Sequence, residues 1–284
     1  MLEQGALYVV GTPIGNLGDL SPRAVETLSQ ADFIAAEDTR VTLRLLNHFG
    51  IKKPLLSYFE HNKQEHGPLI LSRLREGQTC ALVSDAGMPA ISDPGETLVA
   101  ACAQEGVPVY VVPGPTAAVS ALALSGLPTG RFTFEGFLSV NKRHRKAHLE
   151  GLQNEERTMI FYEAPHKLRK TLSDLEKLLG KERRIALCRE LTKVHEEVWR
   201  TTLGEAAAHY RDKEPRGEFV LVVEGASPAP EPQDSLSLEE AVALAQELAG
   251  QGLSPSEAAK EAARQSGLRR GEVYAALVRA QEKG

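Results

Sequence analysis

Short apolar runs alternate with amphipathic stretches along the first half of the chain. An apolar run of about four to eight residues between turn residues is typical of a buried strand, whereas apolar positions three and four apart are typical of a helix. The expected strands are residues 7–10, 33–36, 80–83 and 107–112. The expected helices begin after the cap Ser21-Pro22 and continue at 39–49, 69–75, 96–104 and 116–124. This alternation predicts an α/β fold with a mostly parallel sheet.

A second α/β unit is predicted beyond residue 130. Leucines recur at helical spacing in residues 167–179, which predicts an amphipathic helix. Residues 198–203 alternate between apolar and polar, as in an edge or antiparallel strand, so this half is expected to be mixed rather than purely parallel. The other expected elements are strands at 132–138, 159–162, 185–188 and 219–223, and a helix at 145–152.

A proline-rich segment separates these two units from the end of the chain. The sequence SPAPEPQD has no core-forming residue, so residues 227–236 are assigned as a linker between a second α/β domain, 131–226, and a helical module, 237–284. Three helices are expected in that module, near 237–249, 255–265 and 271–281. A helix-turn-helix relative and a docking or dimer-stabilising bundle both fit, because the nearly balanced charge gives no nucleic-acid signature.

The composition excludes several classes of protein. The 284 residues carry a formal net charge of −5, which argues against a generic nucleic-acid coat but leaves room for a local basic patch. Cys80, Cys102 and Cys188 lie in apolar runs without zinc-ligand spacing, so we expect buried thiols and no metal. The sequence shows neither a signal peptide nor an apolar run of about 20 residues, so a cytoplasmic protein without membrane contact is expected.

Glycine-rich and proline-rich loops follow three of the predicted strands. They read GTPIGNLGDLSP, SDAGMPAISDPG and PGPTAAVSALALSG, and ligands of open parallel sheets bind beyond the carboxyl ends of the strands. The first loop matches neither the dinucleotide-binding fingerprint nor the P-loop, so two interpretations of it remain: a ligand-binding loop and an elaborate turn. In the second loop, Asp85 and Asp93 suit a polar or cationic ligand, or cap turns and helices. In the third, small residues allow close approach of a ligand or tight helix packing.

These loops, together with two further segments, carry a specific resemblance. LYVVGTPIGNLGDLSPRAVETL, IAAEDTR, LVSDAGMPAISDPG, VPGPTAAVSALALSGL and FYEAPHKL resemble, in order, the motifs of the ribosomal RNA small-subunit methyltransferase I family. That family is a branch of the tetrapyrrole methylase (class III methyltransferase) superfamily. The resemblance extends from about residue 5 to residue 225. It implies two α/β domains of the tetrapyrrole methylase type, 1–130 and 131–226, with S-adenosylmethionine held in the cleft between them.

The resemblance also implies a partner and a reaction. It implies a homodimer that methylates the ribose 2′-hydroxyl of a cytidine in the decoding region of 16S ribosomal RNA, within the 30S subunit. The first two loops depart from the Gly-Pro-Gly-like and Gly-Gly-Asp-like versions of tetrapyrrole enzymes, which favours the ribosomal branch over corrin or sirohaem synthesis. The cofactor positions carried over are Pro13, Ser84, Asp85, Ala86, Gly87, Thr116, Ala117, Phe161, Tyr162, Leu191 and Thr192.

A weak nucleophile such as a ribose hydroxyl benefits from a general base. Glu37, Asp38 and Arg40, in the EDTR block after the second strand, are the catalytic candidates. An acidic helix start is the simpler interpretation of the same block, because carboxylates are favoured at helix N-termini. The sequence does not choose the base. His61, Glu163, His166 and Glu190 are the other candidates.

One basic run is the candidate RNA contact. Lys142, Arg143, Arg145 and Lys146 cluster at a predicted helix start, where cations are unfavourable with the helix dipole. Contacts to phosphates would explain their presence, and a solvated charged face is the alternative. Two other functions remain open: a methyltransferase acting on a tetrapyrrole, and a non-catalytic ribosome-assembly factor with the same fold.

Overall fold

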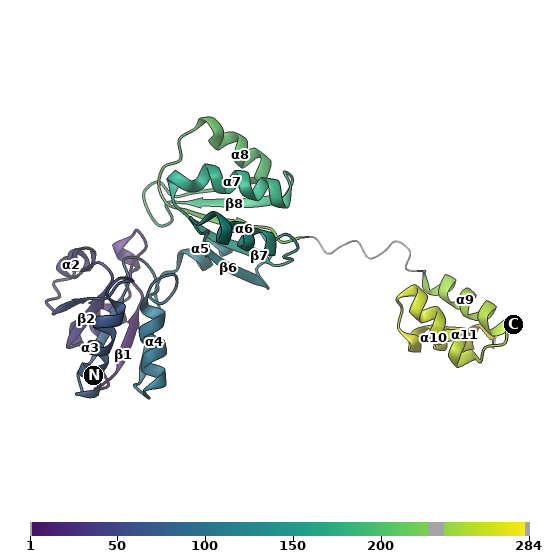
Figure 1. Ribbon diagram of the computed structural model, residues 1–284, viewed down its shortest axis with the longest axis horizontal. Helices are drawn as coiled ribbons and strands as arrows, with labels where there is room; N and C mark the ends of the chain where they lie inside the picture. The colour runs from purple at the N-terminus through teal and green to yellow at the C-terminus, as the bar shows by residue number, and fades with distance from the viewer. Residues whose placement is uncertain (1, 227–235, 282–284) are drawn as a thin grey trace. The chain divides into compact units, whose positions relative to one another are not determined.

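The computed structural model describes residues 2–226 and 236–281 of the chain (Figure 1). These residues form two compact units, Met1–Gly225 and Ala226–Gly284. The predicted linker, 227–236, lies outside the described residues except for its last position. None of the described helices is long and apolar enough to cross a lipid bilayer.

The first sheet is parallel throughout, in agreement with the prediction. Its strand order is β3-β2-β4-β1-β5. All residues of β1, β2 and β4 are buried, which is why these strands read as unbroken apolar runs. The strands are β1 (Leu7–Val10), β2 (Phe33–Ala36), β3 (Leu55–Ser57), β4 (Cys80–Val83) and β5 (Val109–Val112).

Helices cover both faces of this sheet, because alternate residues of each strand pack into different clusters. Leu7 and Val9 join one buried cluster, and Tyr8 and Val10 join the other. The helices of this half are α1 (Pro22–Gln30), α2 (Thr39–His48), α3 (Lys63–Arg75) and α4 (Gly95–Gln104), with the short 3-10 helix η1 (Leu17–Asp19).

Three of the strands and α-helices of this half differ from the prediction by more than one residue, and one of them, β5, begins at Val109 rather than at residue 107. Strand β3 was missed because it has only three residues, all half-buried. Helix α3 begins six residues before the predicted start, since it continues through Gly67-Pro68, a pair that normally breaks helices. Burial of Gly67, Ile70, Leu71 and Leu74 outweighs that local preference.

The second sheet is mixed, as predicted. Its order is β6-β7-β10-β8-β9; β6 and β7 are parallel, and the remaining pairs are antiparallel. The strands are β6 (Phe132–Phe137), β7 (Thr158–Glu163), β8 (Arg184–Arg189), β9 (Glu197–Thr202) and β10 (Phe219–Val223).

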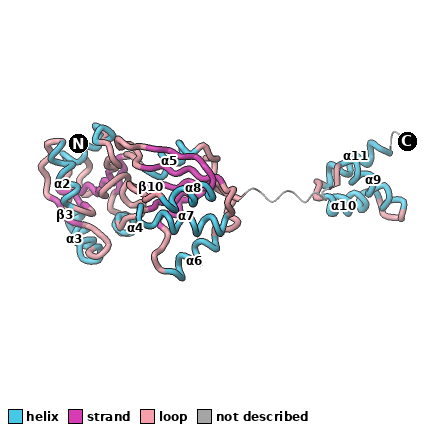
Figure 2. Tube along the Cα trace, turned by 90° about the horizontal axis from the view of Figure 1, so that it is seen from above, coloured by secondary structure: helices cyan, strands magenta, loops and turns pink. Residues whose placement is uncertain are grey.

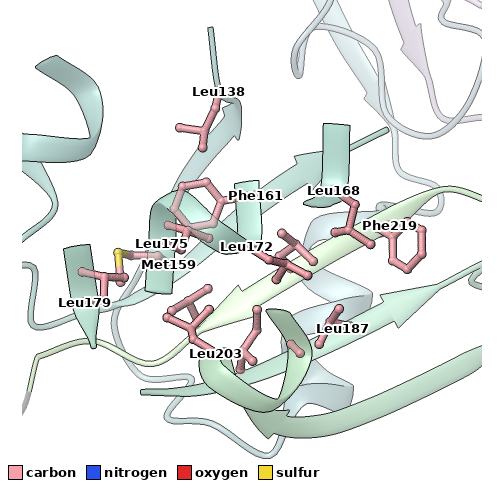
Figure 3. Close-up of a cluster of buried hydrophobic side chains, with 14 of the residues drawn as sticks. Leu138, Met159, Phe161, Leu168, Leu172, Leu175, Leu179, Leu187, Leu203 and Phe219 are labelled. Carbon is pink, nitrogen blue, oxygen red and sulfur yellow. The ribbon is translucent and has the colours of Figure 1, made fainter. Parts of the chain in front are cut away.

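Helix α7 (Pro165–Leu179) closes one face of the second sheet. Its leucines at helical spacing, Leu168, Leu172, Leu175 and Leu179, pack on Phe161, Leu187 and Phe219 (Figure 3). Helix α6 (Lys142–Gly151) lies beside α7, and α8 (Leu203–Asp212) completes this layer. Helix α8 was not predicted, and Leu203, expected to end a strand, begins this helix.

Helix α5 (Ala117–Ser125) covers the opposite face of the second sheet, although it follows the last strand of the first. Ala121 and Leu122 pack with Ile160, Cys188 and Val220. In Figure 1, strand β8 lies between α7 on one side and α5 on the other, and Figure 2 shows the same half from above. Helix α5, which precedes the predicted domain boundary at residue 130, therefore packs with the second sheet.

The C-terminal unit contains three short helices around an alanine-rich core. They are α9 (Leu238–Gly250), α10 (Pro255–Ser266) and α11 (Arg270–Gln281), close to the predicted positions. Ser237 with Glu240, and Ser254 with Glu257, form capping boxes that define the first two helix starts. Ala241, Ala245, Ala258 and Ala262 are fully buried between the helices.

Candidate functional site

A cavity of about 450 Å³ opens within the first unit, between the carboxyl ends of the first sheet and the second sheet. Its walls come from the loops after β2, β4 and β5 and from the ends of β7, β8 and β10. Residues far apart in the sequence, such as Glu37, Tyr162 and Phe219, therefore meet at one site. Its size and position are those of a small-molecule site.

Close backbone contacts hold the loops together. A Cβ on Gly11 would lie 2.7 Å from Gly114 Cα, so the two chains can approach this closely only as glycines. Thr12 and Gly87 exchange two backbone hydrogen bonds, of 2.9 and 3.1 Å. The three loops thus form one rigid assembly rather than three independent turns.

One wall of the cavity is acidic. Glu37, Asp85 and Asp93 all line it. Burial raises the pKa of Glu37, and the neighbouring carboxylates Asp85 and Asp93 raise it further. Burial also raises the pKa of Asp85, and the nearby Asp38 carboxylate adds to the effect. These shifts mean that ionised carboxylates are costly here without a cation, so the wall favours a positively charged ligand.

The rise in the pKa of Glu37 predicts a measurable effect on stability. The folded protein holds this proton to higher pH than the unfolded chain, so stability falls as pH rises from about 4.3 through the folded pKa. At pH values above the folded pKa, Glu37→Gln removes the free-energy cost of holding an ionised carboxylate at this position. We therefore expect it to raise the unfolding temperature of ligand-free protein at neutral pH. Thermal unfolding from about pH 4 to about pH 8 measures this.

The control for that prediction is Glu182→Gln, which changes an exposed glutamate. It should leave the pH dependence as in the wild type. A Glu37→Gln protein that is less stable than the wild type at neutral pH would contradict the prediction.

Another part of the cavity lining is apolar and aromatic. Tyr162 is stacked edge-on by Phe134 and Phe137, at ring distances of 5.0 and 5.5 Å. The Tyr162 hydroxyl accepts the Ala118 N–H at 3.1 Å, which ties β7 to the start of α5. Ile14, Met88, Ala117, Leu191 and Val220 complete this wall. A flat heterocycle fits such a surface, with a charged group toward the acidic side.

Most of the predicted cofactor positions meet in this cavity. Pro13 instead lines a neighbouring cavity of about 270 Å³, which shares Ser84 and Asp85 with the first. Thr192 lies behind the wall, packed against Gly15, with a positive φ of 65°. The predicted residues that line the main cavity are Glu37, Ser84, Asp85, Ala86, Gly87, Thr116, Ala117, Tyr162 and Leu191.

The side chain of Phe161 does not reach the cavity, contrary to expectation. It is fully buried in the cluster under α7 (Figure 3). Successive residues of a strand point to opposite faces, so only one of Phe161 and Tyr162 can face the cavity, and it is Tyr162.

The other two catalytic candidates lie outside the cavity. Asp38 caps α2 by accepting the Arg40 N–H at 2.8 Å, and it also pairs with the Arg40 guanidinium at 2.6 Å. Arg40 holds the pKa of Asp38 well below its usual range. The Asp38 N–H donates to Asp85 at 3.0 Å, so this cap helps to position the acidic wall.

Among the remaining candidates, Glu163 lines the cavity, and His61 and His166 do not. Glu190 is held by Lys193 at 2.9 Å and by the Glu218 N–H at 3.0 Å. Lys193, Glu218 and Ile91 line the cavity but were missed by sequence reasoning. Lys193 and Glu218 lie on loops without periodicity, so no local pattern identifies them, whereas Ile91 lies within the SDAGMPAISDPG loop that follows β4.

The basic helix differs from the prediction at one position. Lys142, Arg143 and Lys146 are exposed on α6. Arg145 is 6% exposed and points inward, where it donates to Asp174 Oδ2 at 2.8 Å and to Thr171 Oγ1 at 2.9 Å. Side chains point in different directions around a helix, so Arg145 can face the interior while its neighbours in the sequence face solvent. Arg145 therefore anchors α6 to α7 and is not available as an RNA contact.

Comparison with known proteins agrees with this architecture. A sequence model of the family described as Tetrapyrrole (Corrin/Porphyrin) Methylases matches residues 6–207. A Synechocystis protein named ribosomal RNA small subunit methyltransferase I is 51% identical over 270 residues, covering 95% of this chain and 96% of its own length. A Thermotoga maritima protein of the same name is 48% identical over 221 residues, covering 78% of this chain and 99% of its own length.

A solved structure shares the fold. The uroporphyrin-III C-methyltransferase of Thermus thermophilus superposes with a TM-score of 0.55 at 22% identity, covering 77% of this chain and 94% of that one. The sequence matches extend over most of this chain, and the observed architecture is that of the matched fold. The chain therefore belongs to the tetrapyrrole methylase family and, within it, to the ribosomal RNA small subunit methyltransferase I family.

Proposed function

We propose that this chain transfers a methyl group from S-adenosylmethionine to the ribose 2′-hydroxyl of a cytidine in the decoding region of 16S ribosomal RNA, on the 30S subunit in the cytoplasm. The cavity with one acidic and one aromatic wall is the observation that carries the proposal. The names of the relatives supply the class of RNA.

The residues of the cavity fit the methyl donor. Burial raises the pKa values of Glu37 and Asp85, so a cationic ligand beside these carboxylates would stabilise their ionised forms. Tyr162 and the apolar side chains around it offer a surface for the adenine. When bound, S-adenosylmethionine supplies a methyl group on a positively charged sulfonium, which is already an activated leaving group.

Positioning is then the main task of the protein. Aligning reacting groups can contribute about 7–11 kcal/mol, which a rigid loop assembly such as that of Gly11, Thr12, Gly87 and Gly114 is suited to supply.

For proton removal we assign Glu37, whose carboxylate would accept the hydroxyl proton as the carbon–oxygen bond forms and the carbon–sulfur bond breaks, its electron pair remaining on sulfur. Its raised pKa makes it a stronger base than Asp38, which Arg40 holds in the ionised form. General-base assistance of this kind contributes about 10²–10⁴-fold. Asp38 and Arg40 act by positioning the loop.

Two further parts of the proposal concern partners. Lys142, Arg143 and Lys146 are exposed and suit RNA phosphates. The edge strand β6 exposes Phe132, Phe134 and Phe137, by 42%, 37% and 54%. An exposed apolar edge of this kind supports a homodimer in which a second copy covers it.

Ribose methylation of 16S ribosomal RNA tests the proposal. We expect a strain lacking this chain to lose one cytidine 2′-O-methyl group, measured by mass spectrometry, and purified chain with labelled S-adenosylmethionine to restore it on 30S subunits. Labelling of a uroporphyrinogen instead would identify a tetrapyrrole enzyme. If calorimetry detected no binding of S-adenosylmethionine, the result would favour a non-catalytic ribosome-assembly factor.

A further inference from the structure

A groove of about 500 Å³ lies between α6 and α7, outside the site described above. Lys142 and Lys146 line it from α6, and Lys170 and Lys177 line it from α7. The α7 pair is seven residues apart, or about 10 Å along the helix axis, and the α6 pair is about 6 Å apart. Two rows of ammonium groups therefore face one channel.

The charges of the groove do not cancel. Arg145 pairs with Asp174 at 2.8 Å, and Lys146 approaches Glu150 at 3.5 Å, where both side chains are well exposed. Within the described residues, Lys142, Lys170 and Lys177 have no carboxylate within 4.0 Å. Three ammonium groups remain uncompensated on a chain whose net charge is −5, which suits a polyanion.

The floor of the groove is rigid and connects to the cavity. Arg145 Nη2 donates to Thr171 Oγ1 at 2.9 Å, and the Thr171 hydroxyl donates to Glu163. A hydroxyl has one proton to donate, and a guanidinium cannot accept a hydrogen bond. The donor and acceptor in each of these two hydrogen bonds are therefore fixed. Glu163 lines the cavity, as does Pro165, the first residue of α7. One helix thus forms a wall of both sites.

We propose that the groove between α6 and α7 binds the phosphate backbone of the RNA substrate, with Lys170 and Lys177 as contacts in addition to those on α6. This rests on the proposed function and extends it to a second helix. Lysine acts on phosphates as a point charge without base selection, so the groove contributes affinity and orientation rather than sequence choice. RNA held there lies at a constant distance from the cavity, because α7 joins the two.

The double variant Lys170→Gln/Lys177→Gln tests the groove. Binding to 30S subunits and to protein-free 16S ribosomal RNA is measured between about 50 and 200 mM salt. We expect about tenfold weaker binding at low salt, and a logarithmic salt slope lower by up to about 1.4, at about 0.7 per lost single-strand contact. The KM for 30S subunits should rise in parallel, with kcat and donor affinity unchanged.

The matched control is Lys52→Gln/Lys213→Gln, which removes the same charge from exposed positions of the same unit. Lys52 precedes β3, at the amino ends of the strands and away from the cavity. A groove variant with the slope and KM of this control would overturn the proposal, as would a loss confined to 30S subunits and absent with protein-free RNA. If the wild type itself transfers no methyl group, the proposed function fails, while the binding slopes still test the groove.

Discussion

Replacing Asp85 with asparagine is expected to weaken S-adenosylmethionine binding about 10- to 100-fold. At an effective dielectric constant of about 20, unit charges about 6 Å apart attract by roughly 3 kcal/mol, part of which desolvation offsets. Asparagine keeps the shape of the side chain and can still accept the Asp38 N–H, so the change removes mainly charge. Calorimetric titration of the variant with the methyl donor measures the loss.

The demethylated product provides an internal comparison, because it lacks the sulfonium charge. Its affinity for the Asp85→Asn variant should change much less than that of the donor. Asp32→Asn is the matched control, since Asp32 also accepts a backbone N–H, from Thr79 at 2.7 Å, but lines no part of the cavity. Equal losses for donor and product would show that the charge of Asp85 does not recognise the sulfonium.

Replacing Gly114 with alanine is expected to reduce donor binding more than about 100-fold. The added Cβ would lie 2.9 Å from both the Cα and the carbonyl carbon of Gly11, so backbone would have to move. Overpacking of this kind costs about 1–3 kcal/mol, which lowers the unfolding temperature by about 3–10 °C in a unit of this size. The larger effect falls on the cavity, because the loops carrying Thr12 and Thr116 would separate.

Gly130→Ala is the control for this change. Gly130 lies between α5 and β6, its φ is not positive, and an added Cβ meets nothing within 4 Å. The unfolding temperature and the donor affinity should therefore fall in Gly114→Ala and stay close to the wild-type values in Gly130→Ala. Donor affinity within about threefold of the wild type in Gly114→Ala would mean that the loop contact does not shape the site.

Many elements follow from local sequence alone. The strands β1, β2, β4 and β10 have the predicted bounds, because each is a short apolar run, buried along its whole length and ended by turn residues. The start of α1 follows from Ser21, whose hydroxyl accepts the Ala24 N–H at 3.1 Å. The family was recognisable from loop motifs in their order, since the loops after the strands carry the site.

The structure was needed wherever a side chain had a choice of direction. Phe161 and Tyr162 are adjacent and both aromatic, yet one enters the core and the other the cavity. Arg145 belongs to a run of similar cations, but only its position on α6 faces Thr171 and Asp174. A sequence shows that side chains alternate in direction along a strand or helix, but it does not show which of them face the interior.

The arrangement of the site depended on the tertiary structure for the same reason. Sequence alone determined the composition of the loops after β1, β4 and β5, the helix caps, and the family to which their order belongs. Only the folded chain decided that α5 packs on the second sheet, that Glu37 and Asp85 share a wall, and that α6 and α7 form a basic groove. Helix caps and buried strands depend on residues that are close together in the sequence. These contacts instead join segments tens of residues apart, so each of them forms only when the intervening helices and strands have packed.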